Sequence, residues 1–342
     1  MQKMAQHMQV EELWFKDGTV VFQAEHKMFC LHSGLVSARS EVFKQILEDK
    51  NSDSAFGITR GIYQTGIPLI QLQETAQDAN NFFLAIYDII SGFFEPPPMK
   101  VSTEVVLSIL RMGTKYHVNA LRRRALAHLN TMYPLTLDEW DRRNETGTMS
   151  VQSEVQASFA HESTFARAFT IAKAAREFAL PWVLPTALYE CCQYDLEVIL
   201  AHFARARDQD IIEADADTEL HNSILVGAFK HMEATRDVLK FLIAESPADI
   251  CADPAACHEV RRVCLNNIYG ITFGSGDPLG IWDDEDWDTY LDGMCPDCVK
   301  LSWEQHKRER LALWRKLPFM YAQATVQNWE VLKEWFDRDM AI

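Results

Sequence analysis

Apolar and polar residues alternate near the start of the chain, in the stretch GTVVFQAEHKMFCLH (residues 18–32). Val20 and Phe22 lie on one face of an extended segment, and Phe29 and Leu31 share a face of the next one. The polar residues QAEH stand between the two segments. This pattern predicts a β-hairpin.

The spacing of apolar residues changes to that of helices directly after this hairpin. The stretch SGLVSARS (33–40) predicts a short helical turn, and SEVFKQILED (40–49) predicts a second helix with Ser40 as its N-cap. The apolar residues of the second helix recur at the spacing that places them on one face. The sequence therefore predicts a strand that passes directly into two short helices.

The next segment predicts one more strand and three helices. IPLIQLQ (67–73) has the composition of a strand, and Thr75 with Asp78 forms the start of a helix that must end before the prolines at 96–98. Two further helical patterns follow and stop at Pro134. Residues 13–134 are therefore expected to form a small α+β domain.

The polar stretch RRNETGTMSVQSE (142–154) is typical of a linker, and nearly all later segments have helical spacing. We expect an N-terminal tail (1–12), an α+β domain (13–134), a linker (135–160) and a mainly α-helical C-terminal domain (161–342). The predicted fold class is thus an α+β domain followed by a mainly α-helical one.

Charge and composition narrow the classes of function. The 342 residues carry a net charge of −16, and the basic runs lie inside helical patterns with acidic neighbours, so direct binding of nucleic acid is not expected. Neither a signal peptide nor a stretch long enough to span a membrane stands out. We therefore expect an intracellular protein, cytoplasmic or nuclear, whose eight cysteines are reduced thiols or metal ligands.

The N-terminal part resembles the BTB/POZ family over about its first 140 residues. The resemblance rests on FKDGTVVFQAEHKMFCLHSGLVSARSEVFKQIL, where five residues match that family's pattern: Asp17, His32, Leu35, Ser40 and Phe43. The stretches GIPLIQLQETAQDANNFFLAIYD and VVLSILRMGTKYHVNALRRRAL resemble its next strand and helix and its closing helix pair. The amino-acid sequence of these segments resembles that of the expanded BTB/POZ group of mushroom-forming fungi.

This resemblance implies a non-enzymatic module for protein–protein interaction that dimerises and docks partner proteins. It implies a BTB/POZ fold with Leu13, Trp14 and Phe15 buried at the dimer, and a structural role for His32, whose ring would satisfy backbone groups where strand becomes helix. Partners would be a second copy, another BTB/POZ protein, or a cullin of a ubiquitin ligase. A role as a transcription-regulatory scaffold stays open, although Ser33 stands where corepressor-binding members usually carry a basic residue.

The later cysteines have a spacing that suggests a metal site. Cys295 and Cys298 form a C-x-x-C half-site, and Cys251 and Cys257 form a looser pair. Each pair precedes a helical pattern, and a helix N-terminus favours the thiolate. This pattern is consistent with two alternatives. The four cysteines either hold a structural zinc as thiolates or are ordinary buried thiols. In the zinc site, His258 or His306 can replace one cysteine as a ligand.

The other cysteines are expected to be small buried hydrophobic residues. Cys264 lies seven helical residues, or about 10 Å, beyond Cys257, too far to share one ion with it. Cys191 and Cys192 are neighbours on a helix that point apart, and Cys30 lies on a strand.

An enzyme reading has one motif in its favour, the HME of residues 231–233 with CPDC downstream. Zinc deaminases use a His and two Cys as ligands and a Glu as proton shuttle, with the proline before the C-x-x-C. Here the proline lies inside the C-x-x-C, and the helix that carries His231 and Glu233 is explained by its apolar face. We therefore expect no catalytic residues.

Overall fold

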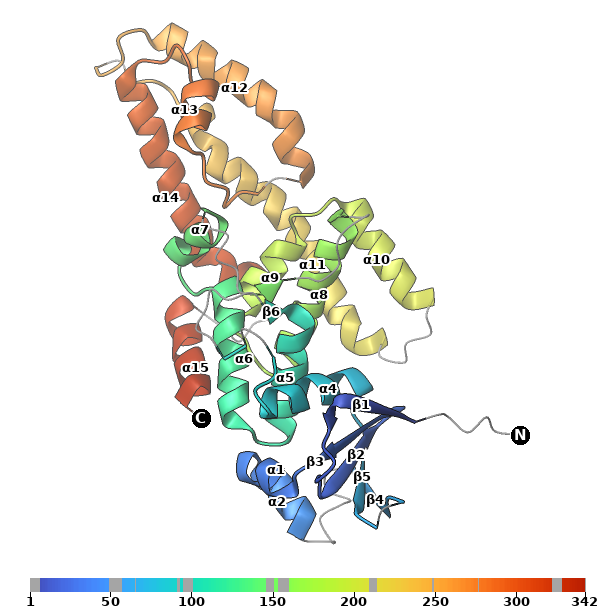
Figure 1. The fold of residues 1–342 in the computed structure, drawn as a ribbon. Helices are drawn as coiled ribbons and strands as arrows, with labels where there is room; N and C mark the ends of the chain where they lie inside the picture. The colour runs from blue at the N-terminus through green and yellow to red at the C-terminus, as the bar shows by residue number, and fades with distance from the viewer. Residues whose placement is uncertain are drawn as a thin grey trace. The chain divides into compact units, whose positions relative to one another are not determined.

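The computed structural model describes residues 7–48, 57–64, 66–90, 93–94, 101–145, 151–152, 160–208, 214–247, 249–275, 277–321 and 328–341 (Figure 1). The chain divides into two compact units. Unit 1 comprises Met1–Met132, Thr146–Glu154 and Asp339–Ile342, and unit 2 comprises Tyr133–Glu145 and Val155–Arg338. The first segment of unit 1 thus ends at Met132, two residues before Pro134, at which the predicted α+β domain ends.

Unit 1 contains a small mixed sheet of five strands in the order β1-β3-β2-β5-β4. The strands are β1 (Met8–Trp14), β2 (Val20–Ala24), β3 (Lys27–Leu31), β4 (Thr59–Ile62) and β5 (Pro68–Leu72). β2 and β3 form the predicted hairpin, with Phe22 opposite Phe29, and β5 lies parallel to β2. β1 adds to β3 in parallel and β4 adds to β5 antiparallel, so β1 and β4 are the two edges.

The helices of unit 1 follow in the predicted order (Figure 1): α1 (Ser33–Arg39), α2 (Glu41–Glu48), α4 (Ala76–Ile86), α5 (Thr103–Lys115) and α6 (Asn119–Met132). Ser40 and Thr75 cap the starts of α2 and α4 as expected, because their hydroxyl oxygens accept hydrogen bonds from the N–H groups of Phe43 and Asp78 at 3.0 Å each. A short pair of parallel strands, β6 (Val101–Ser102) and β7 (Val151–Gln152), belongs to the same unit.

Buried aromatic rings form the centre of unit 1. The ring of Phe43 stacks on Tyr116 with centroids 4.2 Å apart and meets Phe22 edge-on at 5.2 Å. Phe83 contacts both Phe22 and Phe29. This cluster joins α2, α4 and the β2–β3 hairpin into one core.

The regular elements of unit 2 among its described residues are all helical, as predicted. Its helices are α7 (Leu137–Glu145), α8 (Ala160–Glu177), α9 (Leu184–Cys191), α10 (Leu196–Asp208), α11 (Ala214–Val238), the 3₁₀ turn η1 (Leu239–Leu242), α12 (Pro254–Ser275), α13 (Asp284–Tyr290), α14 (Pro296–Tyr321) and α15 (Trp329–Ala341), of which the last residues are counted with unit 1. Within the described part of the chain, no helix is both long and apolar enough to cross a membrane.

Two differences from the sequence prediction concern the predicted tail and the predicted linker. β1 begins at Met8, inside the predicted tail, and most of its side chains are exposed, so it shows no alternation of apolar residues. The helix α7 occupies the first part of the predicted linker and belongs to unit 2. Its Trp140 is fully buried and contacts Trp314 and Tyr189, so a long-range contact holds a segment whose composition is polar.

Candidate functional site

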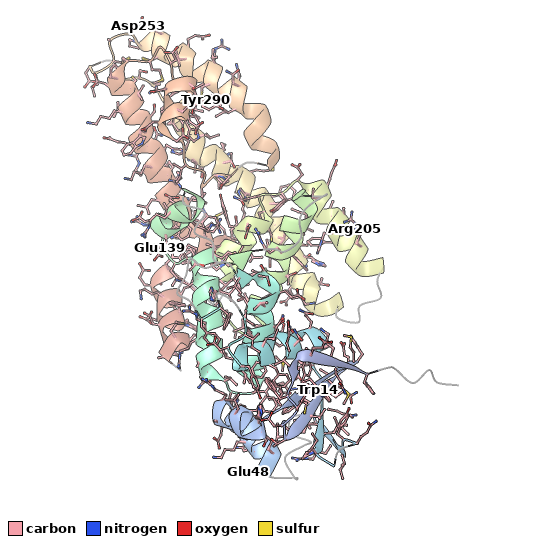
Figure 2. The ribbon with its side chains drawn as sticks, in the orientation of Figure 1. Trp14, Glu48, Glu139, Arg205, Asp253 and Tyr290 are labelled. Carbon is pink, nitrogen blue, oxygen red and sulfur yellow. The ribbon has the colours of Figure 1, made fainter. Side chains whose placement is uncertain are left out.

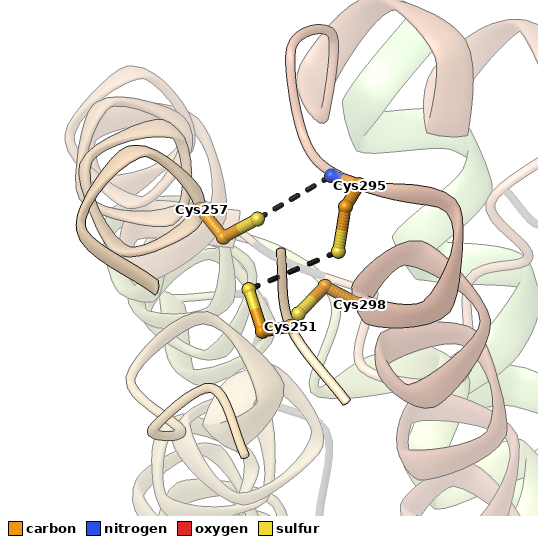
Figure 3. A group of neighbouring side chains, drawn as sticks. All are labelled: Cys251, Cys257, Cys295 and Cys298. Atoms are coloured by element: carbon orange, nitrogen blue, oxygen red, sulfur yellow. Dashed lines mark hydrogen bonds between the residues drawn. The ribbon is translucent and has the colours of Figure 1, made fainter. Parts of the chain in front are cut away.

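The four cysteines with ligand-like spacing come together in unit 2 (Figure 3). Cys251 precedes α12 and Cys257 lies in its first turn, while Cys295 directly precedes α14 and Cys298 lies in its first turn. The four Sγ atoms all lie within 4.8 Å of one another. The two cysteine pairs, which the sequence allows either as one zinc site or as ordinary buried thiols, therefore lie close together, as a shared zinc site requires.

The local sequence explains why both pairs lie at helix starts. Asp253 precedes α12 (Figure 2), and its carboxylate accepts a hydrogen bond of 3.0 Å from the N–H of Ala256. Pro254 and Pro296 are the first residues of α12 and α14, a position at which proline needs no hydrogen-bond partner. Gly293 has a φ of +88° and turns the chain just before the second pair.

The distances between the sulfur atoms fit a tetrahedral ion. A zinc–sulfur bond of about 2.3 Å places the ligands of a tetrahedral site about 3.8 Å apart. The Sγ atoms of Cys251 and Cys295 are 3.8 Å apart, and the widest separation in the group is 4.8 Å or less. A contraction of at most about 1 Å would complete the coordination sphere.

The protonation of the cluster also suits a metal. The N–H of Cys298, at the start of α14, lowers the pKa of Cys295 to about 7. Burial raises the pKa of Cys251, Cys257 and Cys298, so these thiols keep their protons without an ion. A bound cation would displace these protons, so we expect binding to weaken at acidic pH.

The buried side chain of Arg261 forms hydrogen bonds with residues around the cysteine cluster. The guanidinium of Arg261, which is 2% exposed, donates to the carbonyl of Ala244 at 2.7 Å and to the hydroxyls of Ser246 and Ser302 at 3.1 and 3.3 Å. The thiol of Cys298 donates to the same Ser246 oxygen at 3.5 Å. Four thiolates around Zn²⁺ carry a net charge of about −2, which Arg261 and the N-termini of α12 and α14 would partly balance.

Neither histidine considered as a replacement ligand joins the group. His306 is buried among the rings of Phe241, Trp282 and Trp287 at centroid distances of 5.5–5.7 Å. His258 lies on the exposed face of α12. The four-ligand group among the described residues consists of cysteines alone.

The buried His306 predicts a pH dependence of stability. Burial, with Arg310 adding to it, lowers the pKa of His306 from 6.5 to about 3. Between these values the unfolded chain binds a proton that the folded chain does not, so stability falls as pH falls below about 6.5, by about 2 kcal/mol at pH 5. In chemical denaturation at pH 7 and pH 5, His306→Gln should lose this part of the decrease, while the exposed control His258→Gln should keep it. Equal pH dependence in wild type and His306→Gln would contradict the assignment.

The remaining cysteines are buried, as expected. Cys30, Cys191, Cys192 and Cys264 are at most 6% exposed, and Cys264 packs in an apolar cluster with Leu239 and other residues. Burial raises the pKa of Cys264 to about 11. None of the four belongs to the group of possible ligands among the described residues.

The motif considered for a deaminase is not assembled. His231 stacks on Tyr189 with centroids 4.8 Å apart, and the cysteine group holds no histidine within the described residues. Glu233 is exposed on α11. Among the described residues, His231 is therefore not part of the possible zinc site.

The strand-to-helix junction of unit 1 is built around His32. Its N–H donates to the hydroxyl of Tyr87 at 2.9 Å, its Nδ1 lies 3.1 Å from the same oxygen, and its Nε2 lies 3.2 Å from the carboxylate of Asp17. The ring of Phe15 packs against His32 and stacks on Tyr87. Among the described residues, the ring nitrogens of His32 therefore lie next to the side chains of Tyr87 and Asp17, and not next to the backbone groups that we expected.

The other residues of the resemblance are divided between core and surface. Ser40 and Phe43 are buried, and the Ser40 hydroxyl also donates to the carbonyl of Tyr116 at 2.6 Å. Leu13 is fully buried inside its own chain, so in this form it offers nothing to a dimer surface. The half-buried residues Trp14, Phe15 and Leu35 keep part of their surface accessible.

Sequence reasoning missed the residues that support the cysteines. Ser246 and Arg261 have no motif, because their contacts with Cys298 and Ser302 join segments far apart in the chain. Asp253 had a detectable signal, since an aspartate followed by proline is typical of a helix start.

Comparison with known proteins gives no further identification. A scan against protein families, a search of curated proteins and a search of solved structures each found no significant match to this chain.

Proposed function

We propose that this is a non-enzymatic protein for protein–protein interaction that acts inside the cell. Unit 1 serves as a BTB/POZ-type module that self-associates and docks partner proteins, and unit 2 is a helical domain held by a structural zinc ion. The observation that carries the first part is the passage of the β2–β3 hairpin directly into the helical pair α1–α2, with Asp17, His32 and Ser40 at that junction.

The cysteine cluster supports the zinc and the absence of catalysis at this site. Four cysteine ligands fill a tetrahedral coordination sphere and leave no position for water or substrate, which is typical of structural zinc. The zinc would join the starts of α12 and α14. Native mass spectrometry before and after a chelator tests this: we expect about one zinc per chain, and a chain purified from zinc-containing medium without the ion would contradict it.

Self-association predicts a dimer whose surface includes the exposed part of Leu35. Native mass spectrometry should give a mass near twice 39.2 kDa, and Leu35→Asp should shift the chain to monomer while its circular dichroism stays unchanged. Ile62→Asp, at a position 78% exposed on the edge strand β4, is the matched control and should leave the dimer intact. A Leu35→Asp protein of unchanged mass would refute this surface, and a wild-type monomer would refute self-association.

Of the two downstream roles, we favour a substrate adaptor for a cullin ubiquitin ligase over a transcription-regulatory scaffold. Asp17 faces His32, and Ser33 takes the place of a basic residue, which argues against a charged corepressor pocket. The adaptor role predicts direct binding to the N-terminal domain of a cullin in a pull-down with purified proteins. Failure of every cullin to bind would leave the scaffold role.

A further inference from the structure

The four cysteines of the cluster differ in how far solvent reaches them. Cys257 and Cys298 are 1% and 0% exposed and Cys251 is 7% exposed, whereas Cys295 is half-buried. The two residues that follow Cys295 at the start of α14 are both exposed. A small reagent from solvent therefore reaches Cys295 more readily than the other three cysteines.

Cys295 lies next to a thiol of the other pair. Figure 3 shows the side chains of Cys251 and Cys295 directed toward each other, and their sulfur atoms are 3.8 Å apart. A disulfide bond holds two sulfur atoms at about 2.05 Å, so these two must approach by about 1.8 Å. Both residues lie before the first residue of a helix, where the chain can adjust without unwinding a helical turn.

The other two sulfur atoms each take part in a hydrogen bond with a group other than a thiol. The thiol of Cys298 donates to the hydroxyl of Ser246 at 3.5 Å, and the sulfur of Cys257 accepts from the backbone N–H of Cys295 at 3.3 Å. Both are also more deeply buried than Cys251. The geometry therefore favours Cys251 over Cys298 as the thiol that reacts with Cys295, although the latter two form the C-x-x-C.

We propose that Cys295 is a site of reversible oxidation, at which a peroxide links Cys295 to Cys251 in a disulfide and releases the zinc. This inference rests on the zinc site proposed above and adds its regulation. An exposed cysteine with a second thiol beside it is the usual arrangement of a redox-sensing site. Disulfides in a reducing compartment are typically transient and of this regulatory kind.

The reaction proceeds in two displacements. The sulfur of Cys295 attacks one oxygen of hydrogen peroxide, so an S–O bond forms, the O–O bond breaks and hydroxide leaves. The sulfur of Cys251 then attacks the sulfur of this sulfenic acid, so the S–S bond forms, the S–O bond breaks and a second hydroxide leaves. Two thiolates thus lose two electrons, which reduce one peroxide to two hydroxide ions.

The disulfide changes the link between the two helix starts. Only Cys257 and Cys298 remain as thiolate ligands, half of the four that fill a structural zinc site. Yet Cys251 and Cys295 come from the same two segments that the zinc joins, so a covalent bond takes the place of the ion between α12 and α14. A thiol reductant and zinc should restore the first state.

The test treats the purified full-length protein with hydrogen peroxide after its zinc content has been measured. Released zinc is followed with a chromogenic chelator, the free thiols are alkylated, and the disulfide is located by peptide mass spectrometry. We expect about one zinc released per Cys251–Cys295 disulfide, and recovery of both thiols and zinc binding after dithiothreitol and zinc are added. Zinc that stays bound, or a disulfide between Cys295 and Cys298 in its place, would overturn the inference and leave the zinc site standing. A chain without zinc before peroxide is added would overturn the zinc site itself, and with it the release.

Two variants of the same segment then separate the role of Cys251 from the loss of a ligand. Cys251→Ser and Cys257→Ser each remove one of the four thiolates, so both should lose zinc. Only Cys251→Ser should abolish the disulfide, and its Cys295 should proceed to the sulfinic acid because no second thiol traps the sulfenic acid. Equal disulfide yield at Cys295 in the two variants would overturn the assignment of Cys251.

Discussion

Cys298→Ser should reduce bound zinc from about one ion per chain to almost none and unfold the end of unit 2 formed by α12, α13 and the start of α14. Structural zinc sites contribute an apparent binding free energy of about 10–16 kcal/mol, as much as the whole stability of an ordinary domain. Cys298 is fully buried and its thiol donates a hydrogen bond to Ser246. Serine at this position would leave the ion with three of its four thiolate ligands.

Metal analysis and hydrogen exchange measure this result together. Amides of Pro254–Ser275 should lose protection in Cys298→Ser, and adding a chelator to the wild type should reproduce the change. Cys264→Ala is the matched control, because Cys264 is 1% exposed on the same α12 but belongs to an apolar cluster. It should keep its zinc and lose about 1 kcal/mol. Full zinc occupancy in Cys298→Ser would exclude the four-cysteine site.

Phe43→Ala should destabilise unit 1 by about 3–5 kcal/mol, the usual effect of removing a buried phenylalanine. The side chain of Phe43 is fully buried and contacts four other rings of the core: Phe22, Phe82, Phe83 and Tyr116. Its loss opens a cavity at the point where α2 meets the β2–β3 hairpin. Much of the stability of a domain of this size would be lost.

Hydrogen exchange in the full-length protein separates this effect from changes in unit 2. Amides of β2, β3 and α4 should exchange faster in Phe43→Ala, with those of α14 unchanged. Phe94→Ala makes the same chemical change at a side chain that is 43% exposed and should cost less than about 1 kcal/mol. Similar exchange in the two variants would show that Phe43 is not central to the core.

The elements that the sequence predicts well are those with a local pattern. The β2–β3 hairpin and α2 have apolar residues at the strand and helix periods, and Ser40 and Thr75 cap helices by contacts only three residues away. By contrast, β1 has only Leu13 fully buried, and its position depends on pairing with β3. No local period reveals such an edge strand.

The candidate site shows the same division. The spacing of Cys295 and Cys298 and the pair Cys251 and Cys257 suggest metal ligands, because a C-x-x-C half-site is a local pattern. Arg261 could not be predicted, since a buried arginine that binds a backbone carbonyl and two hydroxyls gives no spacing signal. The sequence likewise could not exclude His306 as a ligand, because its packing against Trp282 and Trp287 is visible only in the structure.

The contact between Cys251 and Cys295 has a consequence for how the chain folds. The two residues are 44 positions apart, and the loop between them contains all of α12 and α13. Closing a flexible loop of this length costs roughly 3 kcal/mol of chain entropy beyond a constant term. The proposed ion at the two helix starts would offset that cost, and unlike packing it could do so before α13 has folded. The folding of α12, α13 and the start of α14 should therefore depend on the metal that is present while the chain folds, and not only on the stability of the folded domain.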